Sequence, residues 1–191
     1  MKIENVNVYG IDNAIRVAKF PMAIKTETLD SHITSGIKGL SRSDTGAGHD
    51  NFLNGIIVQF DMTFSNKMSV ELERYHFIDF ISSQSTIHKL SKMDIDKCCN
   101  EYVTEIAKNN LKNLVDNYNK VEDKNSDKAK ELYLKCLYNT PSGFELTAGF
   151  TTNYRQLKTI YFQRKNHKLH EWRTFCKWME SLPLFKELIL G

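Results

Sequence analysis

Two arginines lie within apolar patterns that predict helices. Apolar residues surround Arg74 at offsets of −4, +3, +4 and +7, which form one stripe of a helix: Val70, Phe77, Ile78 and Ile81. Arg164 lies at the end of a similar stripe, formed by Leu157, Ile160 and Tyr161. A guanidinium does not lose its proton, so an arginine held out of water needs an anion beside it. The two arginines therefore predict a cleft that binds phosphate or carboxylate.

Length and charge limit the class of protein. The chain has 191 residues, of which 41% are hydrophobic, and this is enough for one well-packed domain over residues 1–191. The formal net charge is only +3, which is too small for a general binder of polyanions. A basic cluster at residues 164–168 reads as solvated surface as readily as a binding site, so the sequence does not favour nucleic acid as a partner.

The four cysteines do not form a metal-binding pattern. Cys98 and Cys99 are adjacent, Cys136 and Cys176 are isolated, and no Cys-x-x-Cys pair occurs, so we expect free thiols and no zinc site. No stretch approaches the roughly 20 apolar residues of a membrane span. The first ten residues also lack the apolar run of a signal peptide. We therefore expect a protein of the reducing cytoplasm that does not enter a membrane.

The pattern of apolar and turn-forming residues predicts an α+β fold, dominated by helices and with a small sheet. Strands are predicted at residues 5–9, 55–64 and 144–152, and residues 27–50 form a loop or a loop with a short helix. Helices are predicted from Ser65 or Asn66 to about Ser82, over 94–121, from Ser126 to before Pro141, over 153–165 and over about 169–181, with a final turn or two after Pro183.

The most specific pattern begins at residue 152, where Thr-Asn-Tyr-Arg-Gln-Leu is followed by Arg164 and by Glu-Trp-Arg at 171–173. Helix-start amides together with arginine side chains make an anion cradle. The alternative interpretation is a capping Asn153 with arginines on the surface.

These residues resemble the C-terminal motif of the flavin-dependent thymidylate synthases, which is roughly Thr-x-Asn-x-Arg-Ser-Leu, then Arg, then Ala-Gln-x-Glu-Ile-Arg. Upstream, residues 48–55 (GHDNFLNG) resemble the family's Gly-His-x-Ser/Thr-x-x-Glu-His. Residues 71–76 (ELERYH) fall at its Gln-x-x-Arg-His-Arg, and residues 82–88 (SSQSTIH) fall near its Glu-x-Ser-x-Arg-Tyr. The resemblance covers about residues 45–181, and the order and spacing of the motifs carry it.

The resemblance implies a homotetramer whose site forms between subunits and holds FAD and a pyrimidine nucleotide. Arg74 would hold the phosphate or the pyrimidine, Ser85 would contact the nucleotide, and Arg164 would polarise the uracil ring, where charge develops during transfer. The flavin would supply hydride chemistry. The implied contacts are Arg74, Gln84, Ser85 and Arg164 for the nucleotide, and Asn51, Asn54, Asn153 and Arg155 for the flavin.

The chain departs from the family pattern at several charged positions. Tyr75 replaces the family's central His, and His76 replaces its second Arg. The other departures are Glu71 for Gln, Thr86 or Ile87 for the late Arg, Asn54 for Glu, Gly55 for His, and Leu137 for the arginine before the proline. A charge-assisted contact contributes about 1.5–3 kcal/mol, so the losses weigh against the family's usual ligands.

Three functions compete on this evidence. The first is a diverged FAD-dependent pyrimidine methyltransferase, with Arg164, Ser85 and His76 as catalytic candidates. His76 can act as an acid or base near neutral pH, although an ordinary helix histidine is the alternative. The second is a non-catalytic binder that sequesters a signalling nucleotide, and the third is an interaction protein on a fold that has lost its ligand. Because several charged residues of the family motif are replaced, the sequence favours nucleotide binding and leaves catalysis open. We expect homo-oligomerisation with either function.

Overall fold

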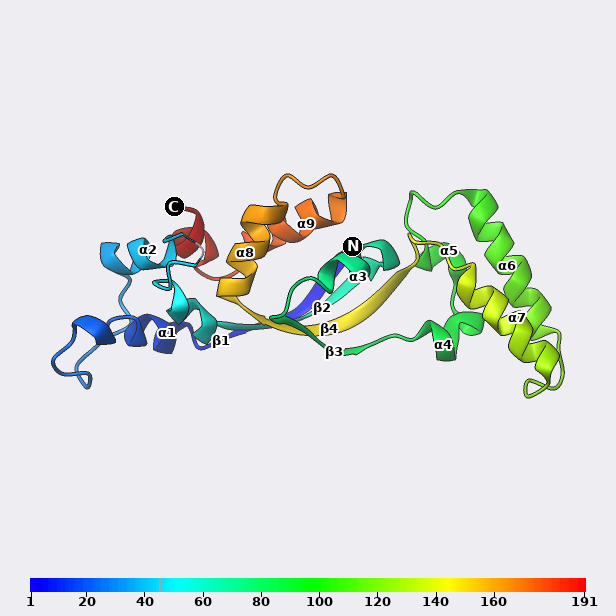
Figure 1. Ribbon diagram of the computed structural model, residues 1–191, viewed down its shortest axis with the longest axis horizontal. Helices are drawn as coiled ribbons and strands as arrows, with labels where there is room; N and C mark the ends of the chain where they lie inside the picture. Colours follow the sequence, from blue (N-terminus) through cyan, green and yellow to red (C-terminus); the bar gives the residue numbers. More distant parts are fainter. Residues whose placement is uncertain (45) are drawn as a thin grey trace. The chain divides into compact units, whose positions relative to one another are not determined.

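A four-stranded sheet forms the framework of the protein (Figure 1). The computed structural model describes residues 1–44 and 46–191; Thr45, the first residue of the region of resemblance, lies outside them. The strand order is β1-β2-β4-β3, with β1 at Lys2–Tyr9, β2 at Ile57–Ser65, β4 at Glu145–Asn153 and β3 at Ile78–Ser83. Phe60 stacks on Phe150 and Thr63 hydrogen-bonds Thr147, so β2 and β4 run antiparallel.

Helices make up most of the regular structure between and after the strands. They are α1 (Ile11–Val17), α2 (Ser35–Ser41), α3 (Asn66–Leu72), α4 (Thr86–Lys89), α5 (Ile95–Cys98), α6 (Glu105–Asn119), α7 (Asp127–Tyr138), α8 (Tyr154–Arg164) and α9 (His170–Met179). Short 3-10 helices lie at Phe20–Met22 (η1), Asn51–Gly55 (η2) and Leu90–Lys92 (η3), and a π-helical segment lies at Lys186–Leu190 (η4). The predicted α+β, helix-dominated class is confirmed.

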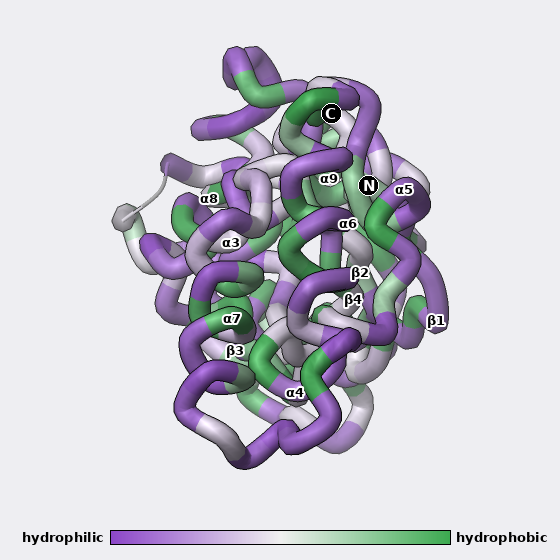
Figure 2. Tube along the Cα trace, turned by 90° about the vertical axis from the view of Figure 1, so that its right-hand side faces the viewer, coloured by the Kyte–Doolittle hydropathy of each residue, from purple (hydrophilic) through white to green (hydrophobic). Residues whose placement is uncertain are grey.

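Backbone contacts divide the described chain into two compact units, and each strand of the sheet contributes to both. The first unit comprises residues 1–2, 62–74 and 82–148. Its core lies where α6 and α7 pack together, with Leu111, Cys136 and Phe144 fully buried. Figure 2 shows hydrophobic residues alternating with hydrophilic ones along α6, as expected for a helix with one buried face.

The second unit comprises residues 3–61, 75–81 and 149–191. Buried side chains alternate with exposed or half-buried ones along most of β2, which places Phe60 on the packed face of the sheet. Phe60 meets Phe150 of β4 and the aromatic rings of Phe175 and Trp178. This aromatic core fixes the end of β4, from which α8 continues directly (Figure 1).

The helix predicted from residue 65 to about Ser82 is wrong beyond Leu72. Ser65 does cap α3, because its Oγ accepts from the Met68 amide at 3.2 Å. However, α3 ends at Leu72, and residues 78–83 form β3 at an edge of the sheet. Gln84 extends this pairing, since its amide donates to the Thr147 carbonyl at 2.9 Å. Pairing with β4 has therefore overridden the helical spacing of the apolar residues.

The predicted apolar stripe around Arg74 consequently does not exist. Val70, Phe77 and Ile81 are 62%, 64% and 61% exposed, and Arg74 itself lies after the helix with an exposed side chain. The inference that Arg74 is held out of water within a helix is thus wrong for the isolated chain.

The long helix predicted over 94–121 is interrupted. Residues 95–98 form α5, and Thr104 starts α6 afresh by accepting from the Ala107 amide at 3.3 Å. Between them, Cys99 forms an isolated antiparallel bridge with Phe144. The four cysteines are free thiols, as predicted. Burial raises the pKa of Cys176 to about 12, so this thiol stays protonated near neutral pH.

Ser126 caps α7, as the sequence predicted. Removing its hydroxyl tests this capping role directly. The Oγ of Ser126 accepts from the Ala129 amide at 3.3 Å. We expect Ser126→Ala to lower the free energy of unfolding by about 1 kcal/mol, measured by urea denaturation, because one helix-start amide loses its partner. Ser126→Asp keeps an acceptor at this position and should stay close to the wild type; equal losses in both variants would contradict the capping role.

None of the helices in the described residues is both long enough and apolar enough to cross a bilayer. Among the same residues, no group of three or more His, Cys, Asp or Glu side chains is arranged to hold a metal ion.

Candidate functional site

The start of α8 forms one wall of a pocket in the second unit. The pocket has a volume of about 340 Å³. Its lining comes from η2, from the residue before β3, from the end of β4 and from the first turns of α8: Asn54, Phe77, Asn153, Arg155, Gln156 and Thr159. Asn54, Asn153 and Arg155 are three of the four residues that the resemblance assigns to the flavin. The structure therefore brings together residues that are about 100 positions apart in the sequence.

Three hydrogen bonds fix the start of α8, and one of them joins it to the residue after η2. Asn153 caps the helix, because its Oδ1 accepts from the Gln156 amide at 2.9 Å. The next amide, that of Tyr154, donates to the Ile56 carbonyl at 3.0 Å, directly after η2. The Tyr154 hydroxyl then donates to the Pro183 carbonyl at 2.6 Å, and burial raises the pKa of this phenol. These bonds fix the backbone that presents Arg155 to the pocket.

A buried carboxylate orients Arg155. The Nε of Arg155 donates to Oδ1 of Asp50 at 3.0 Å, and Asp50 is only 1% exposed. The other oxygen, Oδ2, accepts from the Lys158 Nζ at 2.8 Å. Lys158 is 3% exposed and also donates to the Ser43 carbonyl at 2.6 Å. Asp50, Arg155 and Lys158 thus form an ion cluster, which we call the Asp50 cluster. Asp50 and Lys158 are buried, and only Arg155 lines the pocket.

The terminal nitrogens of Arg155 are not used by this cluster. Only Nε bonds Asp50, and no described residue accepts a hydrogen bond from Nη1 or Nη2. The Arg155 side chain is one-third exposed and lines the pocket. A planar fork of unused donors is the arrangement that grips phosphate or carboxylate oxygens.

Asp50 and Lys158 are site residues that sequence patterns alone did not indicate. A signal for Lys158 was present, because it lies three positions after Arg155 and therefore on the same side of the helix. Its neighbours Leu157 and Ile160 are buried, which makes an unpaired lysine there costly. Asp50 follows His49 in the stretch that resembles the family's first motif, but no spacing rule links it to residues more than 100 positions later.

Arg164 lies at the opposite end of α8. It lies nine positions after Arg155, which corresponds to about 13 Å along the helix axis. Its Nε donates to the Tyr75 hydroxyl at 2.7 Å, and that hydroxyl donates to Oε1 of Gln163 at 3.0 Å. The guanidinium carbon lies 4.9 Å from the centre of the buried Trp172 ring. An aromatic surface and the phenol of Tyr75 therefore position Arg164.

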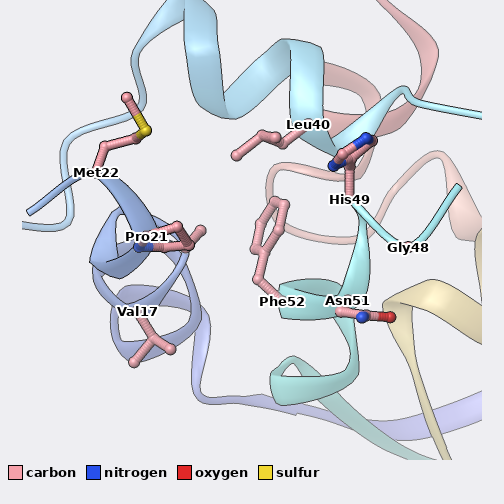
Figure 3. A pocket seen from close by; sticks show the side chains of 9 residues that line it. Val17, Pro21, Met22, Leu40, Gly48, His49, Asn51 and Phe52 are labelled. Atoms are coloured by element: carbon pink, nitrogen blue, oxygen red, sulfur yellow. The ribbon is translucent and has the colours of Figure 1, made fainter.

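A second pocket in the same unit takes the remaining flavin candidate, Asn51. This pocket has a volume of about 600 Å³ and is mostly apolar (Figure 3). Figure 3 shows Phe52 and Leu40 facing the side that carries Val17 and Pro21. Its lining residues are Val17, Ala18, Pro21, Met22, Leu40, Gly48, His49, Asn51 and Phe52. Asn51 is thus separated from the lining shared by Asn54, Asn153 and Arg155.

The remaining predicted site residues do not line either pocket. Arg74, Gln84 and Ser85 belong to the first unit, whereas His76 belongs to the second and is exposed. The Oε1 of Gln84 accepts from the Thr147 amide at 2.9 Å, so this amide oxygen already takes part in the sheet edge. Ser85 precedes α4 as its N-cap residue but makes no side-chain capping bond.

Comparison with known proteins identifies the fold. No family model matches the sequence, and no curated protein matches it. Two crystal structures of the flavin-dependent thymidylate synthase ThyX from Helicobacter pylori, each with FAD and dUMP, are similar over the whole chain. One gives a TM-score of 0.71 at 16% identity and covers 99% of this chain and 100% of that chain. The other gives 0.72 at 15% identity and covers 100% of both chains. The chain therefore adopts the fold of the flavin-dependent thymidylate synthases.

Proposed function

We propose that this protein binds a nucleotide, and that the pocket at the start of α8 takes part of a flavin nucleotide such as FAD. One observation carries the proposal. Asn54, Asn153 and Arg155, which the resemblance assigns to the flavin, line a single pocket. Nη1 and Nη2 of Arg155, which bond no described residue, add donors for a negatively charged group.

The residues of the pocket fit a flavin nucleotide in part. The amides of Asn54, Asn153 and Gln156 both donate and accept, which suits the hydrogen-bonding edge of a ring. Phe77 adds an apolar surface. The volume is near the lower end of the roughly 300–1,000 Å³ of ligand pockets, so it takes one ring system or one phosphate segment. When bound, the flavin would supply hydride chemistry.

The proposal includes a second anionic group near Arg164. Because Arg155 and Arg164 are about 13 Å apart along α8, they cannot hold the same small anion. We assign Arg164 to a pyrimidine nucleotide, and the resemblance adds Arg74, Gln84 and Ser85 to that nucleotide. The ThyX structures from Helicobacter pylori contain FAD and dUMP together. The family's site forms between subunits, so we propose that copies of this chain assemble into a homo-oligomer to complete it.

Native mass spectrometry tests this function, because it reports the number of subunits and any retained small molecule together. We expect an oligomer, and we expect calorimetry to detect binding of FAD or dUMP. A monomer that shows no heat with either ligand would contradict the proposal. An assay for dUMP methylation in the same preparation separates an enzyme with roles for Arg164, Ser85 and His76 from a protein that only binds.

The sharpest variant is Arg155→Ala. We expect it to weaken FAD binding at least about 100-fold in calorimetry, because two charge-assisted hydrogen bonds at about 1.5–3 kcal/mol each are lost. Arg42→Ala is the matched control, since Arg42 is exposed and its described side-chain bond goes to the carbonyl of Glu187. An equal loss in both variants, or no loss in either, would remove Arg155 from the site.

A further inference from the structure

The Asp50 cluster raises a question of charge. A buried carboxylate lies directly behind the arginine that lines the pocket, with its Oδ1 at 3.0 Å from the Arg155 Nε. Asp50 and Arg155 alone would sum to zero charge, and a negatively charged ligand would make the group negative. Such a charge is costly beside a carboxylate that is only 1% exposed. Arg155 therefore needs Asp50 for its orientation, although Asp50 opposes any anion that Arg155 receives.

Lys158 resolves this conflict. Its Nζ lies 2.8 Å from Oδ2 of Asp50, the oxygen that Arg155 does not use. With one carboxylate and two cations, the cluster carries a net charge of +1. The Nζ is directed to Asp50 and to the Ser43 carbonyl, and Lys158 does not line the pocket. Lys158 thus balances Asp50 from behind the wall and leaves Arg155 charged at its front.

We propose that Lys158 is a specificity-determining residue, which makes the pocket selective for the phosphate group of its ligand without touching that ligand. This inference rests on the proposed function, because it concerns the same pocket. It names the ligand group as a phosphate, which either a flavin nucleotide or a pyrimidine nucleotide can supply. A purely structural Lys158 is the competing explanation, since losing a buried ion pair also disturbs the pocket.

Matched ligands separate the two explanations. dUMP differs from deoxyuridine, and FMN from riboflavin, by one phosphate. The ratio of the two dissociation constants in each pair measures the preference for phosphate. A general distortion of the pocket weakens both members of a pair, whereas a change in charge alters the ratio. The pair that responds also shows which nucleotide places its phosphate beside Arg155.

The decisive variants change the charge of the cluster in known steps. The wild type carries +1, Lys158→Met carries 0, and Asp50→Asn combined with Lys158→Met returns to +1. We expect Lys158→Met to lower the phosphate preference by roughly tenfold or more, and the double variant to recover most of it although the lysine is still missing. Lys177→Met, an exposed lysine on α9, controls for net charge and should leave the ratio unchanged.

The outcomes distinguish this inference from the proposed function. If the wild type binds neither FAD nor any of the four ligands, both are overturned, whereas binding of FAD alone overturns only this inference. If the wild type prefers phosphate through Arg155 but Lys158→Met keeps the full ratio, only the role of Lys158 is overturned. A double variant whose phosphate preference is as low as that of Lys158→Met would also overturn only the role of Lys158. Should Lys158→Met fail to fold, Asp50→Asn is compared with the double variant instead, because neither protein contains the buried carboxylate. A phosphate preference about tenfold lower in the double variant supports the inference, and an equal preference overturns it.

Discussion

Replacing Lys158 by methionine is expected to lower the free energy of unfolding by about 3–5 kcal/mol, because it leaves a buried carboxylate with only one cationic partner. Asp50 is 1% exposed, and Lys158 supplies one of its two ionic contacts. Methionine keeps an unbranched side chain of similar length, so the loss reports the charge rather than an empty volume. Urea denaturation of the two proteins measures the difference.

Two variants make this stability prediction specific. Asp50→Asn combined with Lys158→Met removes both charges of the pair, and replacing a buried pair by neutral groups is often close to neutral for stability. We therefore expect the double variant to recover most of the loss. Lys177→Met should change stability by no more than about 0.5 kcal/mol, as for other exposed positions. A Lys158→Met protein as stable as the wild type would show that the Asp50 cluster is not held out of water.

Replacing Trp172 by alanine is expected to cost about 3–5 kcal/mol, because it removes the largest fully buried side chain of the second unit. The Trp172 ring lies 5.7 Å from Tyr75, 6.2 Å from Phe175 and 4.9 Å from the Arg164 guanidinium. The substitution thus removes part of the core and one side of the arrangement that holds Arg164. Denaturation followed by circular dichroism measures the loss of stability.

Trp172→Phe tests which of the two effects dominates. Phenylalanine keeps an aromatic surface under Arg164 but fills less volume, so we expect a smaller loss of stability than with alanine. The Trp172→Phe protein should bind dUMP nearly as well as the wild type. Trp172→Ala should weaken dUMP binding even under conditions in which the protein is still folded. If both variants bound dUMP equally, the stacking of Arg164 on Trp172 would have no part in ligand binding.

The sequence predicted local features well because they depend on neighbouring residues. Ser65, Ser126 and Asn153 each accept from an amide three residues ahead, and this preference is written into the capping residue itself. The edge strand β3 was missed for the opposite reason. Its apolar spacing fits a helix, and only pairing with β4, about 70 residues later, makes it a strand.

The site divides along the same line. Asn54, Asn153 and Arg155 line one pocket. The resemblance could select them together because the motifs of a family mark segments that are distant in the sequence and close in the fold. The Asp50 cluster was not selected, since Asp50 and Lys158 are 108 residues apart. Arg74 shows the limit of inference from periodicity: its predicted burial depended on a helix that the sheet replaces.

A crystal structure of the protein grown with FAD and dUMP tests the central claim most directly. We predict electron density for a nucleotide in the pocket lined by Asn54, Asn153 and Arg155, with ligand oxygens at hydrogen-bond distance from Nη1 or Nη2 of Arg155. An empty pocket in crystals that contain either ligand elsewhere on the chain would contradict it.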